Sequence, residues 1–143
     1  MPETVSPAPT EHACWLPRHR KSAGAARQEL HHFLARHQGV EYLLYTGELL
    51  LSELVANAVQ HARTPQGRLI QIRFGLSENL LRIEVHDADS EKPALRTTST
   101  SDESGRGLFL VKELAAQWGC CPRAGGIGKF IWCHISAPAE AAA

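Results

Sequence analysis

The sequence has no excess of charge of either sign, because its 15 Lys and Arg residues balance its 15 Asp and Glu residues. A balanced chain lacks the electrostatic footprint of proteins that bind nucleic acid or an anionic membrane. The sequence also lacks an apolar run of the ~20 residues that cross a bilayer, and its start lacks the basic-then-apolar pattern of a signal peptide. We therefore expect a cytoplasmic protein that binds neither nucleic acid nor a membrane.

Cysteine is scarce, with four residues in a chain of 143. In the cytoplasm these thiols are expected to be reduced. Cys120 and Cys121 are adjacent, and neighbouring residues of a strand point to opposite faces, so the two cannot easily hold one metal ion. Buried thiols that act as small apolar side chains are the better interpretation.

Internal repeats and linkers are absent too, so the length fits one domain with a single core. Hydrophobic residues make up 43% of the chain, which is ordinary for a globular protein. We place one domain at residues 13–136. The tails at 1–12 and 137–143 have the composition of disordered segments.

Hydrophobic periodicity and turn residues predict the order of the elements. Ser22 is expected to cap the first helix and Gly39 to end it. We expect a strand at 13–16, helices at 22–38 and 41–62, strands at 69–76 and 80–87, a polar loop at 88–104, a helix at 108–117, and strands at 118–123 and 127–136. Helices followed by antiparallel strands indicate an α+β two-layer sandwich, with a mixed, mostly antiparallel sheet and helices on one face.

The second helix is apolar almost all round, yet it carries Glu53, Asn57 and His61 at a spacing of four. Residues four apart lie on one face of a helix. A solvated polar stripe is the ordinary reading of such a pattern. Here the stripe is narrow, and carboxylate and carboxamide oxygens are ligands that Mg²⁺ prefers. The helix therefore predicts one wall of a polar pocket.

Two further segments suggest where that pocket lies. Asp87 ends a strand on the same face as Leu81, Ile83 and Val85, so alternation places its carboxylate on the buried side, unless the strand stops one residue earlier. Glycines in the segment 105–107 come just before a helix, where backbone N–H groups can approach an anion. A flexible hinge would explain the glycines equally well.

Three motifs thus follow one another in the chain. The first is Ser52-Glu53-Leu54-Val55-x-Asn57-Ala58-x-x-His61-Ala62, the second is Val85-His86-Asp87, and the third is Gly105-Arg106-Gly107-Leu108-x-Leu110-Val111. Together they resemble the ATPase superfamily of DNA gyrase, heat-shock chaperones and sensor histidine kinases, which shares the Bergerat fold. The likeness covers about residues 13–135 and is strongest to small stand-alone bacterial ATP-binding regulators, the anti-sigma-factor serine kinases.

The resemblance implies ATP and Mg²⁺ as cofactors and a role for each matching residue. Asn57 resembles the asparagine that ligates Mg²⁺. Glu53 is similar to the carboxylate that positions or deprotonates the attacking hydroxyl or water. Asp87 resembles the aspartate that accepts a hydrogen bond from the adenine 6-amino group. His61 is expected to be structural rather than catalytic.

The third motif completes the implied site. Gly105, Gly107 and Leu108 match the segment whose backbone surrounds the phosphates, and Arg106 could touch a phosphate or a partner protein. The sequence departs from the family in two places. Asp89 stands where relatives have glycine in an Asp-x-Gly-x-Gly pattern, and Phe130 stands where many have a threonine on a late strand near the adenine.

The resemblance therefore implies an ATP-binding regulator that could act as a serine/threonine kinase on an anti-sigma-factor antagonist. Its expected partner is a protein, either a sigma factor or that antagonist, and a homodimer is compatible with the family. A second hypothesis is a non-catalytic binding module with a degenerate nucleotide pocket. Glu53 favours the kinase, while Asp89 and Phe130 favour the module.

Overall fold

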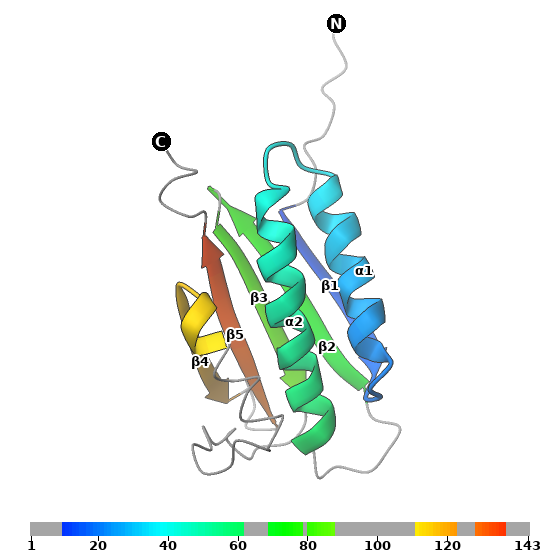
Figure 1. Ribbon diagram of the computed structural model, residues 1–143. Coiled ribbons are helices and arrows are strands. Elements are labelled where there is room, and N and C mark those ends of the chain that lie inside the picture. Colours follow the sequence, from blue (N-terminus) through cyan, green and yellow to red (C-terminus); the bar gives the residue numbers. More distant parts are fainter. Residues whose placement is uncertain (1–9, 62–68, 79, 88–110, 123–127, 137–143) are drawn as a thin grey trace, which may run out of the picture.

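The computed structural model describes residues 10–61, 69–78, 80–87, 111–122 and 128–136. Both predicted tails and the predicted loop at 88–104 lie mostly or wholly outside these ranges. In chain order the elements are β1 (Glu11–Pro17), α1 (Ser22–Ala35), α2 (Tyr42–His61), β2 (Leu69–Ser77), β3 (Leu80–Asp87), β4 (Gln117–Pro122) and β5 (Lys129–Ser136). Figure 1 shows α1 and α2 side by side against the sheet.

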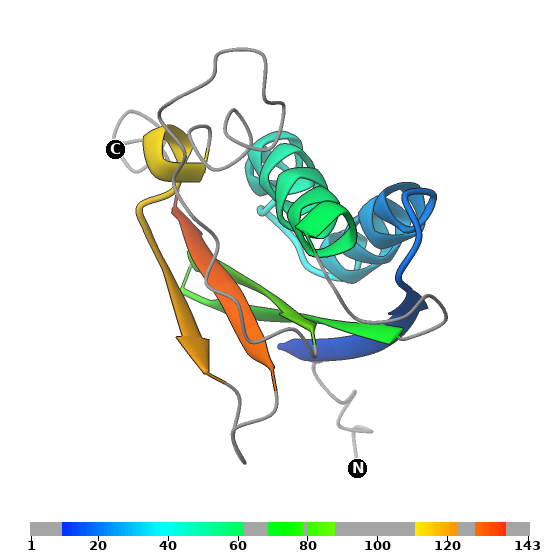
Figure 2. The same ribbon diagram turned by 90° about the horizontal axis from the view of Figure 1, so that it is seen from below.

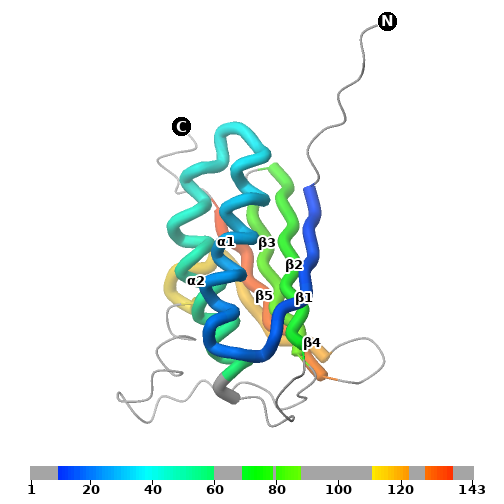
Figure 3. Tube along the Cα trace, turned by 90° about the vertical axis from the view of Figure 1, so that its right-hand side faces the viewer, coloured from blue at the N-terminus to red at the C-terminus, as the bar shows by residue number. Residues whose placement is uncertain are grey.

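The five strands form one sheet in the order β1-β2-β3-β5-β4. Both helices cover the same face of this sheet, as the end view of Figure 2 and the side view of Figure 3 show. The predicted α+β two-layer fold is confirmed. All four strand pairings of the described residues are antiparallel, where a mixed, mostly antiparallel sheet was predicted.

The core lies between the helices and the sheet. Alternate residues of β2, β3 and β5 face the helices, because successive side chains of a strand point to opposite faces. Burying one leucine or isoleucine is worth about 1.5–3 kcal/mol, so this layer supplies most of the stability. The largest fully buried side chains are Leu30, Leu43, Leu50, Leu51, Leu54, Val55, Ile70, Ile72, Leu81, Ile83 and Ile131.

Gly47 lets α2 come close to its neighbours. A methyl group there would lie 3.1 Å from a methyl carbon of Leu30 in α1 and 3.1 Å from one of Leu81 in β3. At Gly47, α2 therefore packs closely against both α1 and the sheet. Among the described helices, none combines the length and apolar content of a membrane span.

The ends of α1 differ from the prediction. Ser22 is the first helical residue rather than the cap, and its hydroxyl donates a hydrogen bond to the carbonyl of Pro17. The helix ends at Ala35 instead of residue 38, and Gly39, with φ of 77°, lies in the connection to α2. The hydroxyl of Ser22 ties the helix to β1, a tertiary contact that local sequence rules do not contain.

The predicted helix at 108–117 is also shorter than expected at its end. Residues 111–114 are helical, whereas Gln117 already belongs to β4 and pairs with His134 of β5. The Ala116 amide donates to the carbonyl of His134, so pairing with β5 starts there. Gln117, which helical periodicity had assigned to the helix, therefore belongs to the sheet.

The face of the sheet away from the helices carries a polar and aromatic network centred on Glu84. Arg82 Nε donates to Glu84 Oε2 and His86 Nε2 donates to Glu84 Oε1, each over 2.7 Å. Arg82 Nη1 donates over 2.9 Å to His134 Nε2, which must be unprotonated to accept it. The network extends to two rings, since His86 stacks on Phe130 and the Arg82 guanidinium lies over Trp132.

This network shifts the pKa of its acidic centre. Burial alone would raise the pKa of Glu84, but hydrogen bonds from Arg82 and His86 and the charges of both outweigh it, so the pKa is lowered. The pKa of His134 is lowered by burial and by the charge of Arg82. Both shifts favour Glu84 ionised and His134 neutral in the folded protein.

We predict that Gly119→Ala destabilises the protein by about 1–3 kcal/mol, because the new methyl group would overpack the sheet. It would lie 2.8–2.9 Å from three atoms of the rigid Trp132 indole. Gly75→Ala is the matched control, since its methyl group would come no closer than 3.9 Å to the Arg82 side chain. Urea unfolding measures both, and equal effects would contradict the account of Gly119.

We also predict that Glu84→Gln lowers the free energy of unfolding near neutral pH by about 1 kcal/mol. Because the pKa of Glu84 is lowered in the folded state, its contribution is present above the unfolded value of about 4.3 and lost as pH falls through the folded value. The difference from the unmutated protein should therefore shrink below about pH 4.3. Unfolding at several pH values tests this, with the exposed Glu113→Gln as control; a pH-independent difference would refute it.

Candidate functional site

Four polar or charged residues of the described chain are buried: Ser22, Asn57, Asp87 and Lys129. Ser22 is satisfied by the carbonyl of Pro17. The other three lie on the last turns of α2, at the end of β3 and at the start of β5, which meet at one end of the fold (Figure 1). Burial of polar groups is costly, so three together mark this end as a candidate site.

Asn57 carries the least satisfied polar atom at this end of the described structure. Its residue is 5% exposed, and within the described structure its side-chain oxygen Oδ1 is buried without a hydrogen-bond partner. A buried polar atom left unsatisfied costs about 1–3 kcal/mol. A carboxamide oxygen is a hard ligand of the kind that Mg²⁺ binds. The predicted metal ligand is thus the residue whose acceptor is left open.

Glu53 lies one turn before Asn57 on α2 and is half-buried. The spacing of four keeps it on the same face as Asn57, as predicted. The predicted stripe also included His61, which is the last residue of α2 and whose side chain lies outside the described part of the structure. The described stripe therefore consists of one carboxylate and one carboxamide.

Asp87 lies where strand parity had placed it. It is the last residue of β3, is 4% exposed and shares the helix-facing side with Leu81, Ile83 and Val85. The alternative, that the strand stops one residue earlier, is wrong because Asp87 still pairs with Lys129 of β5. A carboxylate is thereby held by the sheet beneath the end of α2.

Lys129 is the site residue that the sequence analysis missed. It is 5% exposed and stands directly opposite Asp87 across the β3–β5 pairing. The signal was available in the strand, because Lys129 has the same parity as the apolar residues Ile131 and Cys133. A lysine at the start of a strand is easily mistaken for a solvated residue.

Phe130 does not belong to this site, contrary to the expectation that it replaces a threonine near the adenine. Its neighbour Lys129 faces the helices, so Phe130 points to the other side of the sheet. There its ring stacks on His86 with centroids 4.5 Å apart. The residue of β5 that lies beside Asp87 is therefore Lys129, and Phe130 gives no support to a degenerate pocket.

The predicted phosphate segment lies outside the described residues. It consists of Gly105, Arg106, Gly107 and Leu108, and Asp89 lies outside the described ranges as well. Val111, the last residue of the third motif, is described and fully buried in the core. It ties the end of the third motif to the same hydrophobic layer that holds α2.

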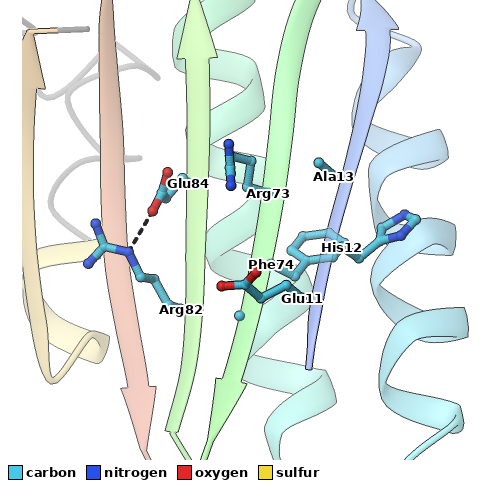
Figure 4. Close-up of a pocket in the computed structure, with 8 residues that line it drawn as sticks. Glu11, His12, Ala13, Arg73, Phe74, Arg82 and Glu84 are labelled. Carbon is cyan, nitrogen blue, oxygen red and sulfur yellow. Dashed lines mark hydrogen bonds and ion pairs between the residues drawn. The ribbon is translucent and has the colours of Figure 1, made fainter. Parts of the chain in front are cut away.

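A separate hollow of about 240 Å³ opens on the face of the sheet away from the helices. Figure 4 shows Arg73, Arg82, Glu84 and Glu11 around it, on neighbouring strands. Its two arginines are balanced by two carboxylates, and Arg82 is already paired with Glu84, so the hollow has no excess of positive charge to attract a phosphate group. This hollow is on the opposite side of the sheet from Asn57 and Asp87, and its charges do not suit a nucleotide.

His12, Cys14 and Glu29 form the only described group with the composition of a metal site, with ligand atoms within 4.8 Å of one another. His12 Nε2 and Glu29 Oε2 are hydrogen-bonded at 2.9 Å, which accounts for their proximity without an ion. Burial, together with the charge of Glu29, raises the pKa of Cys14 to about 11, so its thiol stays protonated. Burial raises the pKa of Cys133 to about 12, as expected of an apolar core thiol.

Comparison with known proteins places the three motifs within one protein family. The family model described as histidine kinase-like ATPase domain matches residues 16–120. This range contains β1 in part, both helices, β2 and β3, and all three motifs. Among curated proteins, none matches the sequence.

Solved structures show the same fold. One similar chain holds the RsbU and RsbW domains of Rv1364c from Mycobacterium tuberculosis, with a TM-score of 0.66 and 20% identity, covering 90% of this chain and 33% of that chain. Another is the histidine kinase domain of the blue-light activated histidine kinase EL346 from Erythrobacter litoralis, with a TM-score of 0.50 and 20% identity, covering 85% of this chain and 61% of that chain. The chain thus spans only part of the length of either.

Proposed function

The chain belongs to the family of histidine kinase-like ATPase domains, and we propose that it is an ATP-binding regulator of the anti-sigma-factor serine/threonine kinase type. It would bind MgATP at the end of α2 and act on a protein partner. The buried, unpartnered oxygen of Asn57, which stands at the motif position of the Mg²⁺ ligand, is the observation that carries this proposal.

The residues present fit the cofactors. Asn57 Oδ1 would supply one oxygen ligand to Mg²⁺, and Asp87 would accept the hydrogen bond of the adenine 6-amino group. Bound Mg²⁺ would neutralise charge on the phosphates, which is most of what phosphoryl transfer requires. The family resemblance implies that the segment 105–108 would surround the phosphates.

Glu53 gives the site a group that could act on a substrate. In the transfer that we propose, the hydroxyl oxygen of a serine or threonine on the antagonist bonds to the γ-phosphorus, the bond to ADP breaks, and Glu53 accepts the hydroxyl proton. The partner would be a sigma factor or an antagonist of an anti-sigma factor. The order of the motifs and the fold shared with an RsbW-containing chain support this choice.

The alternative is a binding module that no longer catalyses. Asp89, two residues after Asp87 in the sequence, favours it, because an added carboxylate repels a triphosphate. The described structure favours the kinase, since Glu53 and Asn57 are both present on one face of α2.

We predict that the protein binds ATP at millimolar concentration or below, and that Mg²⁺ tightens binding. Asn57→Ala should remove most of the Mg²⁺ effect, about tenfold in affinity, because it deletes the oxygen ligand. Calorimetric titration with and without Mg²⁺ measures this. Ser52→Ala is the control: on the same helix, the Ser52 hydroxyl donates to Glu48 and accepts from Arg27.

Two results would count against this prediction in different ways. Absence of binding by the unmutated protein at millimolar ATP would contradict the function itself. Binding in which Asn57→Ala keeps the full Mg²⁺ effect would show that the metal is held elsewhere.

We further predict that Glu53→Gln keeps ATP affinity within about threefold but loses phosphoryl transfer, because glutamine has a similar shape and cannot accept the proton. A pull-down identifies the partner, and transfer of labelled phosphate from ATP to that partner is then followed. If the unmutated protein binds ATP and partner but transfers no phosphate, the non-catalytic module is the better account.

A further inference from the structure

A lysine with 5% exposure is unusual, because a buried ammonium group must be paired to offset its lost hydration. Lys129 faces the helices from the first position of β5, in line with Ile131 and Cys133. A solvated rim lysine would not lie on this side of the strand. The proposed function gives Lys129 no role, so its burial at the candidate site remains to be explained.

The register of the sheet gives the ammonium a specific neighbour. Asp87 and Lys129 are direct partners in the antiparallel pairing of β3 and β5. Residues directly opposite each other share a face of the sheet, with Cβ atoms about 4.5–5.5 Å apart. The carboxylate and the ammonium therefore rise from the same face, beneath the end of α2.

Both groups have more hydrogen-bonding capacity than one partner can use. An ionised carboxylate has about four acceptor positions, and an ammonium has three donors. A ligand at this place would meet an acceptor and a donor side by side. The Watson–Crick edge of adenine offers the complement, since its 6-amino donor adjoins the ring nitrogen N1, an acceptor.

We propose that Lys129 is a specificity-determining residue of the base subsite, donating a hydrogen bond to adenine N1 while Asp87 accepts one from the 6-amino group. This inference rests on the proposed function and adds a second polar contact to the base. Guanine is the competing base, because its O6 would suit Lys129 and its N1–H and 2-amino group would suit Asp87.

The test compares ATP, 1-deaza-ATP, in which C–H replaces N1, and GTP by calorimetry on the full chain. The unmutated protein should bind 1-deaza-ATP about ten- to a hundredfold more weakly than ATP, the range for a hydrogen bond to a charged group. Lys129→Met should bind both with equal affinity. Lys129→Arg, which keeps the charge and the donors, should restore part of the preference for ATP.

Lys129→Met also leaves Asp87 without the opposing cation, which lowers stability. The double variant Asp87→Asn with Lys129→Met removes both charges and should unfold at a higher urea concentration than Lys129→Met alone. It should bind ATP and 1-deaza-ATP equally, so it carries the comparison if the single variant does not fold.

Three results would overturn the inference. Lys129→Met could keep the full preference for ATP over 1-deaza-ATP, the unmutated protein could bind GTP more tightly than ATP, or the two charges could show no coupling in unfolding. If the unmutated protein binds neither ATP nor GTP, the proposed function is contradicted, and the base subsite that rests on it is contradicted as well.

Discussion

The position of α2 is the constraint on which the structure depends. The helix lies beside α1 on one face of the sheet, and Gly47 allows close contact with Leu30 of α1 and Leu81 of β3. Near the end of α2, Leu54, Val55 and Ala58 are buried, and Asn57 on the same turns is only 5% exposed. Asn57 must therefore find partners in the protein or in a ligand, and within the described structure its oxygen finds none. Placing an unsatisfied acceptor in such a helix lowers stability, which is a cost that a binding site can explain.

The sheet divides its polar groups between two faces. On the face away from the helices, Arg82, Glu84, His86 and His134 satisfy one another through short hydrogen bonds. On the helix-facing side, the buried charged residues of the strands, Asp87 and Lys129, stand opposite each other at one end of the sheet. The outer residues are hydrogen-bonded to one another, whereas Asn57 Oδ1 at the inner end is buried without a partner in the described structure. The outer network therefore stabilises the sheet, whereas the inner end has an acceptor that a ligand could use.

Much of this was accessible from the sequence, because periodicity and parity are local properties. The apolar length of α2 and the alternation of β3 were enough to place Asn57 in a buried helix and Asp87 on the helix-facing side. Local rules failed where a partner decides the outcome. Ser22 bonds to β1 instead of capping α1, and Gln117 joins β5 instead of extending a helix. Phe130 was misjudged and Lys129 was overlooked; the parity of β5 separates their faces, and the register with β3 brings Lys129 beside Asp87.

The central claim is that the open oxygen of Asn57 belongs to a metal and nucleotide site. A structure from crystals grown with Mn²⁺ and a non-hydrolysable ATP analogue tests it most directly. The anomalous signal of Mn²⁺ locates the ion independently of any assumed ligand. We expect an anomalous peak about 2 Å from Asn57 Oδ1, with the base beside Asp87 and Lys129. A nucleotide bound in the hollow on the other face of the sheet, or an ion remote from Asn57, would contradict the account.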